Sequence, residues 1–272
     1  MKIQFVDLDK YEEKALAILK TNGNLRLIGE TGTGKTTLVY YLCEKYNWKL
    51  FEYSLNQDTS KYDLLGYDIL EKGETKFKKG IIINWLECND DKYNAYVLYL
   101  DEYNYANPNI RSLLNSLTDF RKKIYIPELN QTYERTEKHY IIISYNPAEK
   151  SSYIGTFADN IAQLRRFESI RLSYMDKMKE VKYLQKITKK DYDTCLRFVE
   201  WADKIRRCYL NGELSNVITT GNLINYLNML DNNNLTIDDI IEIASNNFIF
   251  EEKEKVIRLF GENKVKSDNE DE

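Results

Sequence analysis

A glycine-rich segment near the N-terminus has the composition and spacing of a phosphate-binding loop. Glycines leave room for phosphate oxygens to approach the backbone N–H groups closely. Lys35 is then expected to neutralise the outer phosphates, the Thr36 hydroxyl to ligate Mg²⁺, and Thr37 to close the nucleotide-binding segment. The match to G-x-x-x-x-G-K-[S/T] is complete and consists of Gly29, Glu30, Thr31, Gly32, Thr33, Gly34, Lys35 and Thr36.

The alternative interpretation of this segment is a chance glycine-rich turn. The apolar residues Leu25–Ile28 predict a short strand before it, and Lys35–Tyr46 predicts a helix after it. A phosphate loop needs this order, because the helix adds its positive N-terminal end to the anion site. The context therefore favours binding of a nucleoside triphosphate, expected to be ATP, together with Mg²⁺.

Two carboxylates follow a second apolar strand, predicted over Tyr96–Leu100. Asp101 could hold the hydration shell of a magnesium ion, and Glu102 could orient and deprotonate an attacking water. An acidic strand end that merely faces solvent is the alternative. A further strand, Trp48–Tyr53, is predicted between the loop and the carboxylates in the sequence. This is expected when the strand before the loop and the strand before the carboxylates are not consecutive in the chain.

Two later segments could complete such a site. The apolar stretch Tyr140–Ser144 leads to Asn146, whose amide could position a water opposite the γ-phosphate. An Asn-Pro turn explains the same residues equally well. Arg165 and Arg166 precede a last strand over Ile170–Leu172. A guanidinium suits a phosphoryl transition state, and a solvated pair or a salt bridge within the domain is the alternative.

The order of predicted elements indicates an α/β fold followed by helices alone. The strands should form a parallel sheet with its ligand site at their carboxyl ends. We expect an α/β nucleotide-binding domain over 1–173, a small all-helical lid domain over 174–262 and a disordered acidic tail over 263–272. The other expected elements are helices over Tyr11–Lys20, Ile81–Cys88 and Pro108–Arg121, and a hairpin of Lys123–Ile126 with Glu137–Tyr140 around Asn130.

Composition excludes several classes of protein. A net charge of −4 gives no footprint for broad nucleic-acid binding. The four cysteines form no C-x-x-C pair, and His139 is the only histidine, so no zinc-site spacing exists. The sequence shows neither a signal-peptide pattern nor an apolar run near the roughly 20 residues that span a bilayer. We expect a cytoplasmic protein without membrane partners.

Taken together, these segments resemble an AAA+ ATPase, specifically the clade of MoxR, CbbQ/NirQ-type activators, GvpN, dynein-like modules and McrB. The resemblance runs from about residue 25 to residue 229. It implies an AAA+ core with a five-stranded parallel sheet. The stretches that carry it are D-E-Y-N-Y-A (101–106), S-Y-N-P (144–147), Y-I-G-T (153–156) continuing to R-R-F (165–167), and L-L-G (64–66) with F-K-K-G (77–80).

The resemblance also implies roles. Asn146 would be sensor 1, Arg166 the arginine finger and Arg165 its support. The protein would form a homo-oligomer, usually a hexameric ring, with insertions at about 56–80 and 123–140 facing the pore or the client. Two departures stand out: Tyr105 replaces a basic residue, and Gly221 occupies the place of the sensor-2 arginine.

Three functions stay open from the sequence. The first is an ATPase that remodels or activates a partner protein complex, the client being unknown. The second is a nucleic-acid motor, of the McrB-like restriction or viral packaging and replication kind. Lysines and arginines near the two insertions could then line a basic pore, namely Lys76, Lys78, Lys79, Arg121, Lys122 and Lys123. The third is a nucleotide-dependent switch with little turnover, motivated by the glycine at 221.

Overall fold

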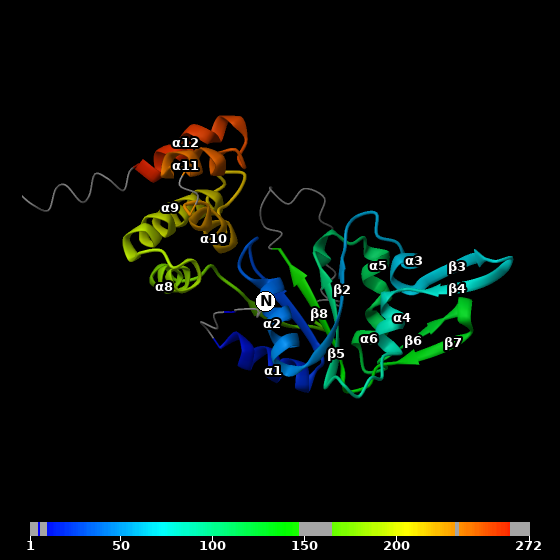
Figure 1. Cartoon of the computed structure of the whole chain (residues 1–272). Coiled ribbons are helices and arrows are strands. Elements are labelled where there is room, and N and C mark those ends of the chain that lie inside the picture. The colour runs from blue at the N-terminus through cyan, green and yellow to red at the C-terminus, as the bar shows by residue number, and fades with distance from the viewer. Residues whose placement is uncertain (1–4, 6–9, 147–164, 232–233, 262–272) are drawn as a thin grey trace, which may run out of the picture. The chain divides into compact units, whose positions relative to one another are not determined.

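The computed structural model describes residue 5 and residues 10–146, 165–231 and 234–261. Its contacts divide the chain into two compact units (Figure 1). One contains the chain up to Glu30 and from Gly34 to Leu172, and we call it the α/β unit. The other contains Thr31–Thr33 and the chain from Ser173 on, and we call it the helical unit. The predicted acidic tail and the Y-I-G-T stretch lie outside the described residues.

Within the described residues, five parallel strands form the main sheet of the α/β unit, in the order β2-β5-β8-β1-β9. This confirms the predicted fold class. Strand β8 lies between β1 and β5 in space, while β2 is at an edge. The strands are β1 (Asn24–Ile28), β2 (Trp48–Ser54), β5 (Ala95–Asp101), β8 (His139–Tyr145) and β9 (Glu168–Arg171).

Helices cover both faces of this sheet, so its central strands are buried on both sides. Along β5, Leu98 and Leu100 pack into one apolar cluster, while Val97 and Tyr99 pack into the other. That explains why the strand is apolar throughout rather than alternating. The helices of the unit are α1 (Tyr11–Thr21), α2 (Lys35–Tyr46), α3 (Lys61–Leu65), α4 (Ile81–Leu86), α5 (Pro108–Leu113) and α6 (Asn115–Thr118).

A hairpin between α3 and α4 was not predicted from the polar sequence of this region. It consists of β3 (Gly66–Glu71) and β4 (Glu74–Lys79), which pair so that Glu71 faces Glu74. The two residues between them, Lys72 and Gly73, both have positive φ, of 53° and 84°. This is the backbone of a tight two-residue hairpin turn, although lysine is not the residue usually found there.

The second hairpin is confirmed, but its predicted second strand was wrong. Strand β6 (Lys123–Ile126) pairs with β7 (Gln131–Glu134), not with 137–140. The chain reverses at once, through a 3₁₀ turn (Pro127–Leu129) and Asn130 at φ 49°. Ile126 therefore pairs with Gln131. The residues expected in the hairpin come later, and His139 and Tyr140 begin β8.

The prediction of a single helix over Pro108–Arg121 was also wrong. Two helices, α5 and α6, are separated at Leu114, and the second ends at Thr118. The side chain of Asp119 stops the helix. Its Oδ1 accepts the Arg121 N–H at 3.0 Å, and Lys122 follows with φ 50°. This local hydrogen bond offers the backbone a turn in place of another helical residue.

The helical unit packs around aromatic side chains from its longest helix. Phe198 and Trp201 stack edge to face and both contact Phe260. None of the described helices is long and apolar enough to cross a membrane. The α-helices of the unit are α8 (Lys177–Thr188), α9 (Tyr192–Leu210), α10 (Thr220–Met229), α11 (Ile237–Ser245) and α12 (Lys253–Gly261), and a 3₁₀ turn (Phe250–Glu252) precedes α12.

The single histidine is a structural residue at the start of β8. His139 Nε2 lies 3.0 Å from the carbonyl oxygen of Trp85, and Nδ1 lies 3.2 Å from the Thr136 N–H. A carbonyl only accepts, so Nε2 carries the proton and Nδ1 accepts. Burial lowers the pKa of this ring to about 4. His139 is therefore neutral in the folded protein at pH 7.

This gives a pH-dependent term in stability. Because the folded pKa lies below the unfolded value near 6.5, the unfolded chain takes up the proton first as the pH falls. This difference should lower the free energy of unfolding by about 3 kcal/mol between pH 7 and pH 4. Urea unfolding of the wild type and of His139→Gln tests it. The stability advantage of the wild type should shrink as the pH is lowered, and an advantage independent of pH would contradict it.

Candidate functional site

The predicted phosphate loop joins the carboxyl end of β1 to the start of α2. Gly32 and Gly34 have φ values of 80° and 89°, in the region that residues with a Cβ rarely adopt. Gly34 is the N-cap of α2, and the first turn of this helix contains no acidic residue. The positive end of the helix is therefore not neutralised from within, which suits an anion.

Lys35 is buried at the base of this loop. Its Nζ donates to the carbonyl oxygens of Gly29 at 2.7 Å and Glu30 at 3.1 Å, and to Asn146 Oδ1 at 2.8 Å. Burial lowers the pKa of Lys35 to about 8, although Asp101 and other carboxylates favour the charged form. The third bond places the amide predicted as sensor 1 beside the lysine predicted to bind phosphate.

Thr36 and Asp101 meet on the same face of the sheet. Thr36 Oγ1 lies 3.2 Å from Asp101 Oδ2 and 3.1 Å from the hydroxyl of Tyr99. On the neighbouring strand, Ser144 donates a short hydrogen bond to Asp101 Oδ1. Tyr99 and Ser144 were not singled out from the sequence. Their signal is a polar side chain inside an apolar strand, two residues from a predicted site residue and hence on the same face.

Glu102 follows Asp101 with a left-handed backbone conformation, at φ 55°. Its N–H lies 2.9 Å from Asp101 Oδ1 and 3.0 Å from Ser144 Oγ. The side chain is exposed, and its Oε2 lies 3.4 Å from Ser54 Oγ at the end of β2. The sharp turn thus directs the two consecutive carboxylates to different places.

The backbone of Asn146 is held by the buried side-chain amide of Asn104. Its N–H donates to Asn104 Oδ1 at 3.3 Å. The Asn104 backbone is held in turn, because its carbonyl oxygen accepts from Arg111 Nη2 at 2.6 Å. Since Asn146 Oδ1 accepts from Lys35, its NH₂ group is the one that could donate to a phosphate oxygen or a water. Asn104 is fully buried, and it stands in the D-E-Y-N-Y-A stretch.

Arg166 is not brought to this cluster. Its carbonyl oxygen accepts from Asn24 Nδ2 at 3.0 Å, at the amino end of β1. Its guanidinium lies 3.3 Å from Asp119 Oδ2 and makes a short hydrogen bond to the Asn115 carbonyl oxygen. The loop leaves the other end of the same strand. Five residues of β1 therefore separate Arg166 from the loop, roughly 16 Å at the usual rise of a strand.

The donor set at Thr36 and Asp101 fits magnesium. One hydroxyl and one carboxylate are hard oxygen ligands, and Mg²⁺ usually completes its shell with phosphate oxygens and waters. No group of three or more histidine, cysteine or acidic side chains that could hold a metal exists among the described residues. Binding of a metal here would therefore need oxygens of a phosphate held by the loop as further ligands.

Comparison with known proteins identifies the family of this arrangement. The AAA domain of the dynein-related subfamily matches residues 24–157, a range that contains the phosphate loop, both carboxylates and Asn146. Residues 24–157 therefore form an AAA domain of the dynein-related type.

Other proteins are similar to this chain in sequence or in fold. The AAA+ chain is 29% identical over 162 residues to an uncharacterized protein of Staphylococcus saprophyticus and 28% identical over 164 residues to one of Staphylococcus epidermidis. In both cases the match covers 60% of this chain and 60% of the relative. A crystal structure of a Cytophaga hutchinsonii protein shares the fold, with a TM-score of 0.50, 21% identity and coverage of 92% of this chain and 88% of that one.

The helical unit of this AAA+ chain contributes no arginine at the expected place. Gly221 lies in the first turn of α10. Just before it, the carbonyl oxygen of Ile218 accepts from Arg206. The Arg206 guanidinium is buried in a bidentate pair with Glu180, at 2.6 and 2.8 Å. This arginine therefore fixes the unit internally.

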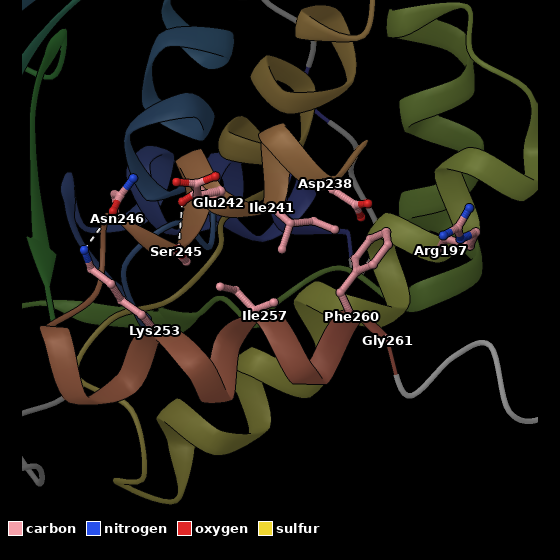
Figure 2. A pocket seen from close by; sticks show the side chains of 10 residues that line it. All are labelled: Arg197, Asp238, Ile241, Glu242, Ser245, Asn246, Lys253, Ile257, Phe260 and Gly261. Carbon is pink, nitrogen blue, oxygen red and sulfur yellow. Dashed lines mark hydrogen bonds between the residues drawn. The ribbon is translucent and has the colours of Figure 1, made fainter. Parts of the chain in front are cut away.

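A pocket lies between α11 and α12 of the helical unit, and Arg197 of α9 reaches its rim (Figure 2). Its polar side chains serve the surrounding helices. Ser245 donates to the Glu242 carbonyl oxygen, and Lys253 donates to Asn246 Oδ1, both at 2.7 Å. Nothing in this lining repeats the arrangement of the phosphate loop and carboxylates in the AAA domain.

Proposed function

We propose that this chain binds and hydrolyses ATP with Mg²⁺ at a site that a second copy of the chain completes. The phosphates would lie along the loop from Gly29 to Thr37, against its N–H groups and the start of α2. Lys35 would exchange one of its three hydrogen bonds for a phosphate oxygen. The bond to Asn146 is the one that side-chain movement alone can release, so phosphate binding would also release the Asn146 amide.

The metal would be held by Thr36 directly and by Asp101 through its hydration shell. When bound, Mg²⁺ neutralises charge that develops on the phosphate oxygens. Two hydrogen bonds would keep these ligands in place. Ser144 of β8 contacts Asp101, and Tyr99 of β5 contacts Thr36.

Glu102 would act as the general base. Its carboxylate is exposed and extends from the carboxyl end of β5, where an attacking water has access. A positioned carboxylate that accepts the proton contributes typically 10² to 10⁴ in rate. The released amide of Asn146 would hold the same water in line with the γ-phosphate, while Ser54 orients the carboxylate through its hydroxyl.

The position of Arg166 is the observation that carries the oligomeric part of the proposal. The loop and this arginine are attached to opposite ends of β1, so one chain cannot bring them to one phosphate without taking its central sheet apart. An arginine that serves the reaction must therefore come from a neighbour. A head-to-tail contact of this kind generates a closed ring when the rotation closes, and we propose a ring, usually hexameric in this family.

Two hairpins support remodelling of a protein client as the purpose of hydrolysis. Both extend from the same end of the α/β unit (Figure 1). Lys61, at the start of α3, lies 3.3 Å from Glu128 in the turn of the β6–β7 hairpin. The β3–β4 hairpin exposes 77% of Leu70. Two of its lysines pair with glutamates, Lys76 with Glu71 at 3.0 Å and Lys79 with Glu87 at 2.6 Å, which weakens the positive charge that a phosphate backbone would need. We therefore favour a protein client over a nucleic acid.

Turnover should depend on protein concentration. A monomer lacks the arginine, so the ATPase rate per chain should rise as copies associate and then level off, over about a hundredfold range of concentration. Phosphate release measured beside light scattering tests this, with Lys35→Ala as the control for contaminating ATPase. A rate per chain that does not change with concentration, from a protein that scatters as a monomer, would refute the shared site.

A further inference from the structure

Tyr99 lies beneath the proposed magnesium site. It is fully buried in the centre of β5, two residues before Asp101 and on the same face of the sheet. Its ring packs in the apolar cluster under α2, and its hydroxyl lies 3.1 Å from Thr36 Oγ1. Asp101 and Ser144 are also within reach of this hydroxyl. The phenol is thus the one tyrosine of β5 whose polar end enters the site.

The hydrogen-bonding capacity of Thr36 shows what this contact does. A threonine hydroxyl has one proton and two lone pairs. The proton is directed to Asp101 Oδ2. If Tyr99 donates to one lone pair, the other is left for the metal, and the hydroxyl can no longer rotate without losing two hydrogen bonds.

The opposite face of β5 offers a comparison. Tyr96 is equally buried, but its hydroxyl donates to the Asp90 carbonyl oxygen at 3.1 Å. A buried tyrosine needs some partner for its hydroxyl. Tyr96 finds one in a loop carbonyl, whereas Tyr99 finds one in a predicted metal ligand.

We propose that Tyr99 is a positioning residue for magnesium: its hydroxyl donates to Thr36 Oγ1 and holds that oxygen in the orientation in which it can ligate the ion. This inference rests on the proposed function. Tyr99 itself is not a ligand, because its action runs through the threonine.

The test compares Tyr99→Phe with Tyr96→Phe, since both changes remove one buried hydroxyl from the same strand. Binding of mant-ATP to the full chain is followed by fluorescence, first with EDTA and then over a magnesium titration. For Tyr99→Phe, the magnesium concentration at half-effect should rise by about three- to tenfold, the value of one hydrogen bond. Its affinity without metal should stay within about twofold. Tyr96→Phe should leave the magnesium midpoint where the wild type has it.

A second measurement tests whether Tyr99 acts through Thr36. In Thr36→Ala, the additional change Tyr99→Phe should no longer move the midpoint, because the two residues share one interaction. Equal midpoints for Tyr99→Phe and wild type, or equal weakening with and without metal, would overturn the inference and leave the proposed ATPase standing. A wild type whose mant-ATP binding does not respond to magnesium would overturn both.

Discussion

Glu102→Gln should abolish ATP turnover and leave ATP binding intact. The amide keeps the size of the side chain but cannot accept the proton of the attacking water. We expect the turnover rate to fall by at least about 10². The Glu102 contacts that shape the turn come from its backbone N–H, so the loop, Lys35 and Asp101 should stay in place. Phosphate release and mant-ATP titration on the same preparation measure the two effects.

A matched control for this substitution is Glu52→Gln. Glu52 lies on the neighbouring strand β2, and its carboxylate accepts a short hydrogen bond from Tyr40, away from the proposed water. It carries the same change in charge and should keep turnover near the wild-type rate. A Glu102→Gln protein that retains more than about a tenth of the wild-type rate would show that another group takes the proton. A wild type that binds ATP and assembles without turnover would favour the nucleotide switch.

Arg166→Ala should reduce turnover by about 10³ or more, the usual contribution of an arginine that stabilises a phosphoryl transition state. ATP binding should change little, because in the proposed arrangement the arginine would reach a neighbour's phosphate only in the assembled protein. Arg166 also pairs with Asp119 in its own chain, which calls for a control. Asp119→Asn removes that pair and keeps the arginine. It should retain most of the turnover, whereas a purely structural role would make the two variants equally inactive.

Mixing two inactive variants tests whether Arg166 acts between chains. The Arg166→Ala chain has an intact site, and the Glu102→Gln chain has an intact arginine. In an equimolar mixture, about a quarter of the head-to-tail contacts should combine the two intact halves, and phosphate release should recover accordingly. Absence of recovery, in mixtures shown to contain both chains in one assembly, would place the action of Arg166 within its own chain.

The sequence predicted those parts of the site that are local in the chain. The loop from Gly29 to Thr36 has a pattern whose physics depends on neighbouring residues, and Asp101 and Glu102 stand at the end of a strand whose apolar run is plain. For Ser144 and Tyr99 the sequence offers only a polar side chain within an apolar strand, which does not show what that side chain contacts. Their importance depends on β8 lying between β1 and β5, which is decided by packing over the whole sheet.

The errors have a similar origin. The helix expected over 108–121 ends early, at Thr118, because Asp119 accepts a hydrogen bond from the Arg121 N–H, a contact that competes with helix formation. The hairpin strand expected over 137–140 belongs to β8, where the main sheet takes His139 and Tyr140. In both cases the helical or apolar tendency was predicted correctly. A hydrogen bond within the chain's own turn ended the helix, and pairing with the main sheet took the strand.

The connection from Asn24 to the phosphate loop limits how neighbouring chains could influence one another. Strand β1 is hydrogen-bonded on both sides, to β8 and β9, so it can neither slide nor lengthen alone. The Asn24 side chain attaches its amino end to the backbone of Arg166 and, through Arg135 Nη1 at 2.7 Å, to the loop that follows β7. In the proposed ring, the strand would keep a constant distance between the nucleotide site of one chain and the arginine that it offers to the next. A change at one nucleotide would reach the adjacent one as a tilt of the entire α/β unit, and successive hydrolysis events would be timed by rigid rotation rather than by local rearrangement.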